Sequence, residues 1–242
     1  MPTYCDLHIH SCLSPCAQDE MTPWNLVGMA KVKGLDVIAL TDHNAALNVP
    51  EAMRAAETYG VQLIPGMEVT TREEVHMLAY FETVQADLAF AEAVYAHLPD
   101  IHNRTDLFGN QWIIGAEDQP TGQLEKLLLN ATDLSLSELD NLVTAHGGLL
   151  VPAHINRGAN SMIVSLGWMP PLPQYPVVEV YSRLPCPPDA VANRHVLHSS
   201  DAHRLEDIAE RDFTLDVAEP TAAAVFDQLR RWIAEGGTPL AD

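Results

Sequence analysis

Residues 6–10 read Asp6-Leu7-His8-Ile9-His10, and this alternation of polar and apolar side chains is typical of a β-strand. On a strand the two histidines point to one face, about 7 Å apart at their Cα atoms, while Leu7 and Ile9 pack on the other face. Two imidazoles at that spacing can converge on one metal ion. Taken alone, the pattern fits a metal site and a pair of structural histidines equally well, so the rest of the chain decides.

The composition indicates an acidic globular protein. The chain has 242 residues, 47% of them hydrophobic, which suffices for one large core of the size of an α/β barrel. Lys and Arg number 13 against 33 Asp and Glu, which gives a formal net charge of −20. Such a surface repels polyanions, so we expect neither nucleic acid nor an anionic membrane as a partner. Bound divalent cations can still make one pocket locally positive.

The start of the chain and its cysteines favour a cytoplasmic location. Residues 1–4 form neither the basic region nor the apolar core of a signal peptide, and no apolar run approaches the ~18 residues that span a bilayer. The four cysteines form no CxxC pair and no disulfide-like framework. They are Cys5, Cys12, Cys16 and Cys186.

Strands and helices alternate through the first 81 residues. A helix is expected over residues 23–33, with Thr22 as N-cap, Pro23 at its first position and Gly34 after its end. A second helix is expected at residues 50–59. Apolar runs predict strands at residues 37–40, 61–65 and 75–81. This order implies right-handed crossovers and a parallel sheet.

Between residues 83 and 145 this alternation is interrupted. A polar, glycine-containing stretch at residues 103–122 lies among three predicted helices, at residues 84–97, 124–130 and 135–146. We interpret residues 83–145 as an inserted cap within a single domain over residues 1–242. Further strands are predicted at residues 149–153, 176–181 and 196–198, followed by an amphipathic helix at residues 220–235.

Eight side chains of metal-ligand type stand at or near the ends of the predicted strands, where α/β sheets collect their polar chemistry. They are His8, His10, His43, Glu68, His76, His154, Asp201 and His203. Six imidazoles and two carboxylates are a ligand set for more than one transition-metal ion, and a carboxylate such as Glu68 can bridge two ions. Sites of this kind lower the pKa of bound water and clamp the attacking and leaving oxygens of a phosphoryl ester.

The same residues resemble the successive motifs of the PHP (polymerase and histidinol phosphatase) superfamily, in the family's order and across nearly the whole chain. The matching segments are Asp6-Leu7-His8-Ile9-His10-Ser11, Thr41-Asp42-His43-Asn44, Gly66-Met67-Glu68 with Val75-His76, Ala153-His154, and Ser200-Asp201-Ala202-His203. The resemblance implies an α/β fold, a distorted (β/α)7 TIM-like barrel. It also implies two or three ions of Zn, Mn or Fe, and hydrolysis of phosphate esters by a metal-bound hydroxide.

Carried over by motif, the resemblance assigns ligands to three ions. The first ion would be held by His8, His10, Glu68 and Asp201, the second by Glu68, His76 and His154, and the third in part by His43 and His203. Asp201 and His203 would be catalytic, with His203 a candidate for protonating the leaving oxygen.

Three further residues have expected roles beside these ligands. Arg157 is a candidate for gripping the substrate phosphate, although a surface salt bridge would explain it equally well. We expect Asp42 to orient the ligands rather than bind metal, and Glu179 to be structural or orienting. The remaining histidines are expected to lie outside the site: His97, His102, His146, His195 and His198.

The loop after His10 departs from the family pattern. Relatives commonly place an aspartate or a histidine five or six positions on, where this chain has Pro15 and Cys16. Proline cannot ligate through its side chain, whereas a Cys16 thiolate suits zinc, and Asp19 or Glu20 could reach the site instead. Cys16 as a plain loop thiol is the other interpretation, so the third position is left open.

These observations predict a metal-dependent phosphoesterase that acts on a small phosphorylated substrate, a phosphomonoester. The alternatives are a nuclease or exonuclease of the same superfamily, which the net charge and the missing polymerase domain disfavour, and a catalytically idle metal-binding module. An amidohydrolase barrel would share the first HxH, but it would want a carboxylated lysine. No lysine follows a predicted barrel strand.

Overall fold

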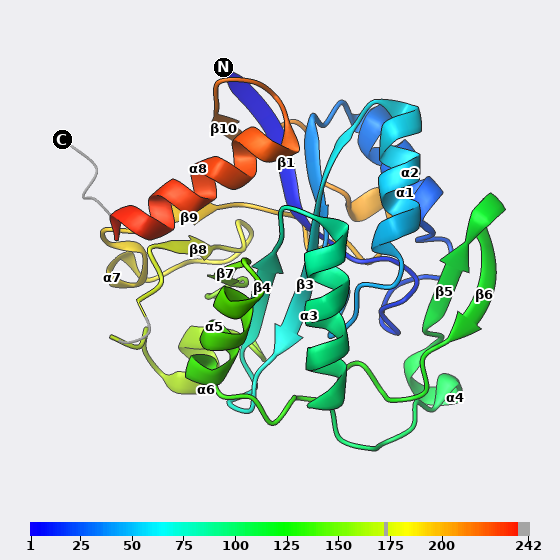
Figure 1. The fold of residues 1–242 in the computed structure, drawn as a ribbon. Helices are drawn as coiled ribbons and strands as arrows, with labels where there is room; N and C mark the ends of the chain where they lie inside the picture. Colours follow the sequence, from blue (N-terminus) through cyan, green and yellow to red (C-terminus); the bar gives the residue numbers. More distant parts are fainter. Residues whose placement is uncertain (172–173, 237–242) are drawn as a thin grey trace.

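The structure, a computed structural model, describes residues 1–171 and 174–236. A curled sheet forms a half-barrel whose outer side is covered by helices (Figure 1). The strands that build it are β1 (Pro2–Ile9), β2 (Val37–Leu40), β3 (Gln62–Thr70), β4 (His76–Tyr80), β7 (Leu149–Pro152), β8 (Val177–Glu179), β9 (His195–Leu197) and β10 (Thr214–Asp216). Within the described residues the main sheet has the order β10-β1-β2-β3-β4-β7, and β8 pairs with β9.

Backbone hydrogen bonds link the segment after β7 to β8 and the segment after β9 to β1, so the sheet curves toward a closed barrel. After β7, the Ile155 amide donates to the Glu179 carbonyl of β8 at 2.9 Å. After β9, Ala202 forms a parallel bridge with Ile9 of β1, and its carbonyl accepts from the His10 amide at 3.0 Å. The predicted α/β barrel is therefore confirmed, in a distorted form.

The expectation of an all-parallel sheet is wrong at β4. The strands β1, β2 and β3 are parallel, but β4 runs antiparallel to both β3 and β7. The connection from β3 to β4 is a short turn, and parallel neighbours would need a much longer crossover. This reversal places His76, the first residue of β4, opposite Thr70 near the end of β3. Because β3 is longer than expected, Glu68 lies within the strand rather than after it.

The helices around the sheet are α1 (Pro23–Lys33), α2 (Val49–Tyr59), α3 (Val84–Ala96), α5 (Leu136–Ala145) and α8 (Ala222–Glu235). The predicted signals of α1 are confirmed. The Thr22 side chain accepts a hydrogen bond from the Asn25 amide, Pro23 begins the helix, and Gly34 follows it with a φ of 74°. That left-handed conformation favours glycine and explains why the helix ends there.

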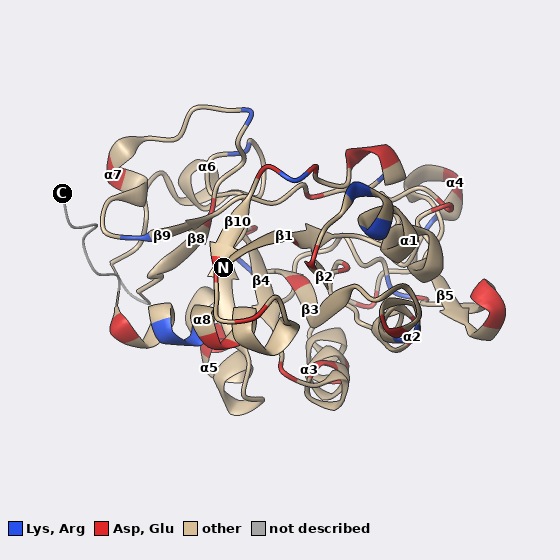
Figure 2. Cartoon of the chain, turned by 90° about the horizontal axis from the view of Figure 1, so that it is seen from above, with Lys and Arg blue, Asp and Glu red and all other residues tan. Residues whose placement is uncertain are grey.

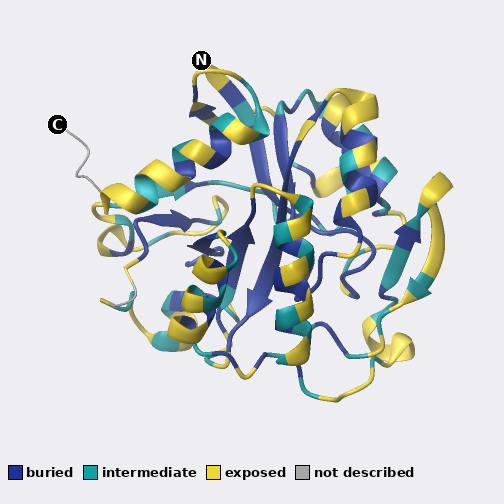
Figure 3. Cartoon of the chain, in the orientation of Figure 1, coloured by how far each residue is buried: buried dark blue, intermediate teal, exposed yellow. Residues whose placement is uncertain are grey.

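The sheet is buried on both faces, as the apolar run of β2 predicts. Ile38 and Leu40 pack in one layer with α1 and α2, whereas Val37 and Ala39 pack in another layer with Phe226 of α8. Figure 3 shows the strands buried and the outer sides of the helices exposed. With both faces packed, the polar side chains of this sheet are expected at the ends of its strands.

The segment 83–145 combines two kinds of structure. Its helices α3 and α5 pack on β3 and β7, while α4 (Thr105–Phe108) and the hairpin of β5 (Trp112–Gly115) and β6 (Gln119–Gln123) leave the sheet (Figure 1). Acidic residues gather at the tip of the hairpin (Figure 2). The boundary of an inserted cap stays a prediction.

The helix expected at residues 124–130 is wrong. This stretch is irregular, and the Gln111 side chain satisfies its backbone instead. The Gln111 amide nitrogen donates to the carbonyls of Leu124 and Lys126 at 2.9 Å, and its oxygen accepts from the Leu128 amide at 2.9 Å. A long-range side chain therefore replaces the local hydrogen bonds of a helix.

Two further parts of the fold were not expected from the sequence. Strand β10 pairs antiparallel with β1, so that Pro2 lies opposite Asp216. Short helices, α6 (Met162–Leu166) and α7 (Pro188–Val191), follow β7 and precede β9. Among the helices of the described residues, none is both long enough and apolar enough to span a membrane.

Candidate metal centre

Glu68 lies at the centre of a cluster of imidazoles at the open end of the barrel. Its Oε1 is 2.9 Å from His76 Nδ1 and 3.1 Å from His154 Nε2. Its Oε2 is 3.0 Å from His43 Nδ1 and 3.4 Å from His10 Nε2. Burial alone would raise the pKa of Glu68, but the neighbouring imidazoles, above all His76, hold it well below its usual range. A carboxylate whose ionised form is stabilised by its neighbours therefore faces four different strands and loops.

Asp201 faces the other side of the same cluster. Its Oδ1 lies 3.3 Å from His8 Nε2 and 3.2 Å from His10 Nε2. The Nδ1 of His203 is 3.6 Å from the same oxygen. His8 Nε2 also lies 3.4 Å from Glu68, so the first strand contacts both carboxylates. The structure thus brings together all eight predicted ligand residues.

The ligand atoms form three overlapping groups in which every atom lies within 4.8 Å of the others. The groups are His8, His10, Glu68 and Asp201; His43, Glu68 and His76; and His10, His43 and His203. The first group has the same members as the predicted first site. In the second, His43 takes the place expected for His154, although His154 contacts Glu68. The roles of these residues as ligands stay a prediction.

The donor atoms fit divalent transition-metal ions. His43 Nδ1, Glu68 Oε2 and Asp201 Oδ1 are buried and have no hydrogen-bond partner within the described residues. Buried polar atoms are normally satisfied, so such a concentration requires an explanation. Furthermore, Nε2 of His8 and Nε2 of His10 face each other at 3.0 Å. A cation among these atoms would satisfy them together, and mixed imidazole and carboxylate ligands suit Zn, Mn and Fe.

Glu179, at the end of β8, orients two of the histidines. Its Oε2 contacts His8 Nδ1 at 2.9 Å and accepts from the backbone amide of His154 at 2.9 Å. Burial would raise the pKa of Glu179, but the charge of His8 and its hydrogen bond lower it. A carboxylate on Nδ1 fixes the ring so that Nε2 points into the cluster. The contact agrees with the orienting role expected for Glu179.

A serine that the sequence did not single out orients His10. The Ser14 hydroxyl donates to Asp42 Oδ1 at 2.7 Å. Ser14 Oγ in turn accepts from His10 Nδ1 at 3.0 Å and from the His43 amide at 3.1 Å. Asp42 also accepts from the Ser11 amide at 2.7 Å. His10 therefore presents Nε2 to the cluster. The role of Ser14 depends on how the turn after His10 folds. No periodic spacing relates Ser14 to the motifs, so the sequence did not indicate that role.

The backbone is left-handed at two of the clustered residues. His154 has a φ of 27° and Asp201 a φ of 52°. Such conformations are costly for residues other than glycine, and they persist where the surrounding structure holds them. Here the Ser200 side chain and amide donate to Asp6 at 2.6 and 3.0 Å, which anchors the loop that carries Asp201. Asp6 therefore holds this loop rather than joining the cluster.

The imidazoles have strongly different affinities for protons. Burial lowers the pKa of His8, but Glu179 and Glu68 outweigh this effect and raise it to about 10. Burial also lowers the pKa of His43, but Cys16 and Glu68 outweigh this effect and raise the pKa to about 9. Burial prevails at His76 and lowers its pKa to about 4. A metal ion would therefore displace protons from His8 and His43 at neutral pH.

His203 enters the cluster as a neutral ring. Its Nδ1 donates to the carbonyl of Asp201 at 2.9 Å, and its ring stacks on His10 with centroids 4.2 Å apart. Burial and the neighbouring His10 and His43 lower the pKa of His203. A neutral imidazole of this kind can bind a metal or accept a proton, whereas it holds no proton of its own on Nε2 to donate.

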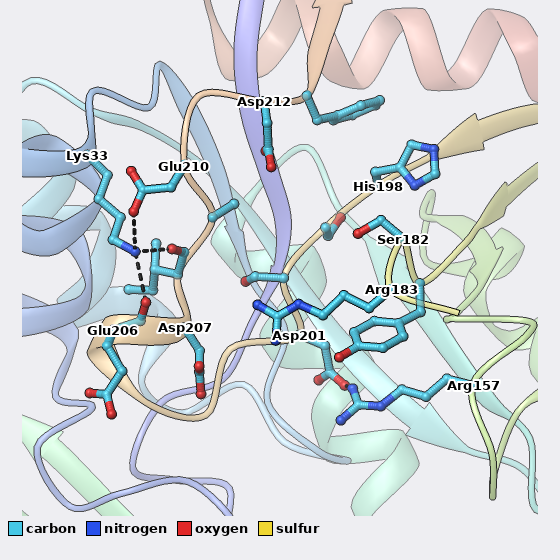
Figure 4. Close-up of a pocket in the computed structure, with 16 residues that line it drawn as sticks. Lys33, Arg157, Ser182, Arg183, His198, Asp201, Glu206, Asp207, Glu210 and Asp212 are labelled. Carbon is cyan, nitrogen blue, oxygen red and sulfur yellow. Dashed lines mark hydrogen bonds and ion pairs between the residues drawn. The ribbon is translucent and has the colours of Figure 1, made fainter. Parts of the chain in front are cut away.

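Arg157 lies at the border between the cluster and a neighbouring pocket. Its guanidinium pairs with Asp201 Oδ2 and stacks 4.8 Å from the ring centre of Tyr181. The pocket has a volume of about 480 Å³ and is lined also by Arg183 (Figure 4). Acidic side chains form its far wall: Glu206, Asp207, Glu210 and Asp212. Tyr181 and Arg183 follow β8, and the sequence did not single them out.

The other five histidines have different neighbours. His97 pairs with Asp133 at 2.6 Å, His146 contacts the Leu142 carbonyl, and His195 stacks on Trp232. His102 forms a bridge with Lys126. His198 lines the pocket, with its Nδ1 3.0 Å from the Val180 carbonyl.

Comparison with known proteins relates this cluster to one sequence family. The sequence model of the PHP domain matches residues 6–145, which is more than half of the chain and includes the first five clustered residues. A 5'-3' exoribonuclease of Haemophilus influenzae is 39% identical over 69 residues. That match covers 28% of this chain and 24% of the exoribonuclease, so the chain spans only a part of its relative.

Solved structures share the fold over nearly the whole chain. The lesion-specific endonuclease EndoQ of Pyrococcus furiosus superposes with a TM-score of 0.67 at 20% identity, covering 96% of this chain and 56% of EndoQ. A putative metal-dependent phosphoesterase of Bifidobacterium adolescentis gives a TM-score of 0.58 at 21% identity, covering 99% of each chain. Likeness at this level of identity shows the fold alone. Together with the sequence match over residues 6–145, it leads to one conclusion: the chain belongs to the PHP family.

Proposed function

We propose that this protein is a metal-dependent phosphoesterase that hydrolyses a small phosphomonoester. One observation carries the proposal: a buried cluster of imidazoles and carboxylates, some of whose atoms have no hydrogen-bond partner in the described residues, adjoins a pocket. Arg157 lines that pocket and pairs with Asp201 of the cluster. Divalent ions of Zn, Mn or Fe would lower the pKa of a bound water and balance the charge of the phosphate oxygens. The chain's own residues would supply binding, orientation and proton transfer.

The ligands would divide among two or three positions. His8, His10, Glu68 and Asp201 would hold the first ion, as their convergence supports. Glu68 would be shared with a second position that includes His76, with His43 or His154 completing it. His43 and His203 would contribute to a third position.

Asp201 and His203 would both serve catalysis from one loop, where His203 Nδ1 lies 3.6 Å from Asp201 Oδ1. Asp201 presents Oδ1 to the cluster and Oδ2 to Arg157, so it joins the ligands to the substrate pocket. His203 is neutral and its Nδ1 donates to the Asp201 carbonyl, so only Nε2 is free. Where the third position holds no ion, Nε2 would first accept the proton of the attacking water and then return it to the leaving oxygen. This order differs from direct donation by an imidazolium.

Arg157 would bind the phosphate of the substrate. Its planar guanidinium offers parallel donors that match two phosphate oxygens, and it already lies against Asp201. The stacking on Tyr181 holds the guanidinium plane at the pocket.

The pocket favours a small substrate. Lys33 is paired with Glu210 at 3.1 Å, and the carboxylates of the far wall would repel a second stretch of phosphate backbone. A nuclease remains the second candidate, because the matched exoribonuclease and EndoQ act on nucleic acid by their names. EndoQ has also been solved with a 27-mer duplex bearing an abasic lesion. These likenesses count against the expectation that nucleic acid is not a partner.

A hydrolysis panel tests the proposal. Protein stripped of metal is reloaded separately with Mn, Zn and Fe and assayed on p-nitrophenyl phosphate, nucleoside mono- and bisphosphates, single-stranded DNA and RNA. The proposal expects metal-dependent release of phosphate from small esters, lost in Asp201→Asn and kept in His97→Ala, whose ring pairs with Asp133. Cleavage of DNA or RNA alone would establish the nuclease. Stoichiometric metal without turnover of any substrate would mean an idle binding module.

A further inference from the structure

The loop after β7 carries His154 and Arg157, and three residues further on it carries Asn160. Asn160 contacts His76 twice. Its carbonyl accepts from the His76 amide at 2.9 Å, and its side-chain Nδ2 lies 2.9 Å from His76 Nε2. The loop is therefore joined to the first residue of β4 through both the backbone and the side chain of one asparagine.

The backbone around Asn160 holds its carboxamide in this position. Asn160 has a φ of 63°, a left-handed conformation that asparagine tolerates better than most residues. The next residue, Ser161, donates through its hydroxyl to the Gly158 carbonyl at 3.0 Å and accepts from the Val164 amide at the start of α6. The loop is thus fixed on both sides of Asn160, so the contact with the ring of His76 belongs to a built arrangement.

Each ring nitrogen of His76 has a different partner. Nδ1 lies 2.9 Å from Oε1 of Glu68, at the centre of the cluster, and Nε2 faces Asn160. The side chain of His76 is only 12% exposed, so the ring is enclosed between these two groups. The carboxamide therefore occupies Nε2 and leaves Nδ1 directed at the cluster.

The two histidines of β1 have the opposite arrangement. Glu179 contacts Nδ1 of His8 at 2.9 Å. Ser14 contacts Nδ1 of His10 at 3.0 Å, so both rings present Nε2 to the cluster. A hydrogen bond at one ring nitrogen decides which nitrogen is available to a metal ion. The same rule, applied to His76, selects Nδ1.

We propose that Asn160 is a positioning residue that fixes Nδ1 of His76 as the ligand atom at the second metal position. The proposal rests on the second position of the proposed function. A ligand bond at Nδ1 places the single proton of the neutral ring on Nε2. The carboxamide can donate to a bare Nε2 through Nδ2 or, after a half-turn, accept from a protonated Nε2 through Oδ1. Asn160 therefore partners either tautomer, as Nδ1 loses one proton to solvent and Nε2 takes one up.

Long-range NMR that correlates ring protons with ring nitrogens tests the assignment directly, because protonated, bare and metal-bound nitrogens have different chemical shifts. The full chain, labelled with ¹⁵N in its histidines, is loaded with zinc, which is diamagnetic. The signals lost in His76→Gln identify His76. The native chain is expected to show zinc on Nδ1 and a proton on Nε2 of His76. Zinc on Nε2, or no zinc on this ring, would overturn the proposal.

Zinc affinity supplies the second readout. Loss of a hydrogen bond to a metal ligand typically costs about 10–100-fold in affinity, so Asn160→Gly should weaken one zinc equivalent by about tenfold or more. Asn160→Asp should bind this equivalent at least as tightly as the native chain, because a carboxylate accepts from Nε2. Glycine and aspartate both tolerate a left-handed φ, so a difference between the two variants reports the hydrogen bond and not the backbone.

Asn193→Gly is the matched control, because Asn193 is exposed and also left-handed, with a φ of 60°. This variant should bind zinc as the native chain does. Unchanged affinity in Asn160→Gly, or an equal loss in Asn160→Asp, would refute the positioning role. Neither measurement requires turnover. Protein that gives both expected results without hydrolysing phosphate esters would therefore refute only the proposed function.

Discussion

The two walls of the candidate site are built differently. The inner wall consists of buried residues such as His8, His10 and Glu68, whose positions are set by partners such as Glu179 and by Ser14 with Asp42. The outer wall, around residues 182–183 and 206–212, presents mainly exposed side chains that reach into the pocket from loops. Arg157 connects the two walls, because it pairs with Asp201 of the cluster and lines the pocket (Figure 4).

This difference separates chemistry from specificity. A buried, hydrogen-bonded network has one arrangement and a high cost of disruption, so it suits the metal ions and the reacting atoms. Exposed loop residues can change without disturbing the fold, so they suit recognition of the rest of the substrate. We therefore expect substitutions in the inner wall to reduce metal binding and activity more than substitutions in the outer wall.

The largest effect is expected from Glu68→Gln. This change keeps the shape but removes the charge that faces the imidazoles of four other elements, so metal binding and activity should fail together. We expect kcat/KM for p-nitrophenyl phosphate to fall about 10³-fold, roughly 4 kcal/mol of transition-state stabilisation. Glu210→Gln, on the outer wall, is the control and should retain activity. Equal losses in the two variants would remove the distinction between the walls.

A smaller effect is expected from Glu179→Gln, because Glu179 acts through His8. The variant should keep its fold and weaken metal binding by about 10–100-fold, and raising the metal concentration should restore much of the activity. Equilibrium dialysis with zinc measures the affinity. If excess metal restored nothing, Glu179 would have a role beyond orienting His8.

Arg157→Lys examines the border between the walls. A lysine keeps the charge but cannot form the paired donors, so kcat/KM should fall about tenfold, roughly 1.4 kcal/mol, mostly through KM. Arg183→Lys, exposed at the mouth of the same pocket, should change kcat/KM less for the smallest ester. Steady-state kinetics of both variants provide the comparison. A larger loss in Arg183→Lys would assign the phosphate to the outer wall.

The smallest effect is expected at Asp87 in α3, a carboxylate as buried as Glu68. Both of its oxygens lack a hydrogen-bond partner in the described residues. Burial, and then Asp42, raise its pKa well above the usual range. The folded protein therefore binds a proton that the unfolded chain releases near pH 4, so stability is lost as pH rises from there toward the raised pKa.

Asp87→Asn should remove this penalty. We expect a gain of about 1 kcal/mol at pH 8, or roughly 2–4 °C in Tm, and a smaller gain at pH 5. Thermal unfolding at both pH values measures it, with Glu92→Gln on the exposed side of α3 as the control. Equal gains at the two pH values would mean that ionisation of Asp87 does not limit stability.

Much of the candidate site could be predicted from residue type and position. The pairing of His8 with His10 follows from the period of a strand, and His43 and His154 follow buried strands directly. Their convergence follows because strand ends of one sheet share an edge. Glu68 and His76 were identified for a partly wrong reason, since β4 is antiparallel and its start, not its end, lies at that edge.

The partners of these residues could not be predicted. Ser14 depends on the fold of an irregular turn, and the contact between Arg157 and Asp201 joins residues 44 positions apart. Gln111 replaces an expected helix through hydrogen bonds that no local pattern encodes. Side chains on loops meet according to the paths of separate segments, and those paths have no periodicity in the sequence.

The sequence by itself determined the family, the barrel class of fold and the types of side chain at the strand ends, because periodicity and motif spacing are local properties of the chain. Only the tertiary structure decided the direction of β4, the grouping of His43 with Glu68 and His76, and the orienting contacts of Glu179. These features depend on distances between remote segments, which are set only when the sheet curls and its loops pack together.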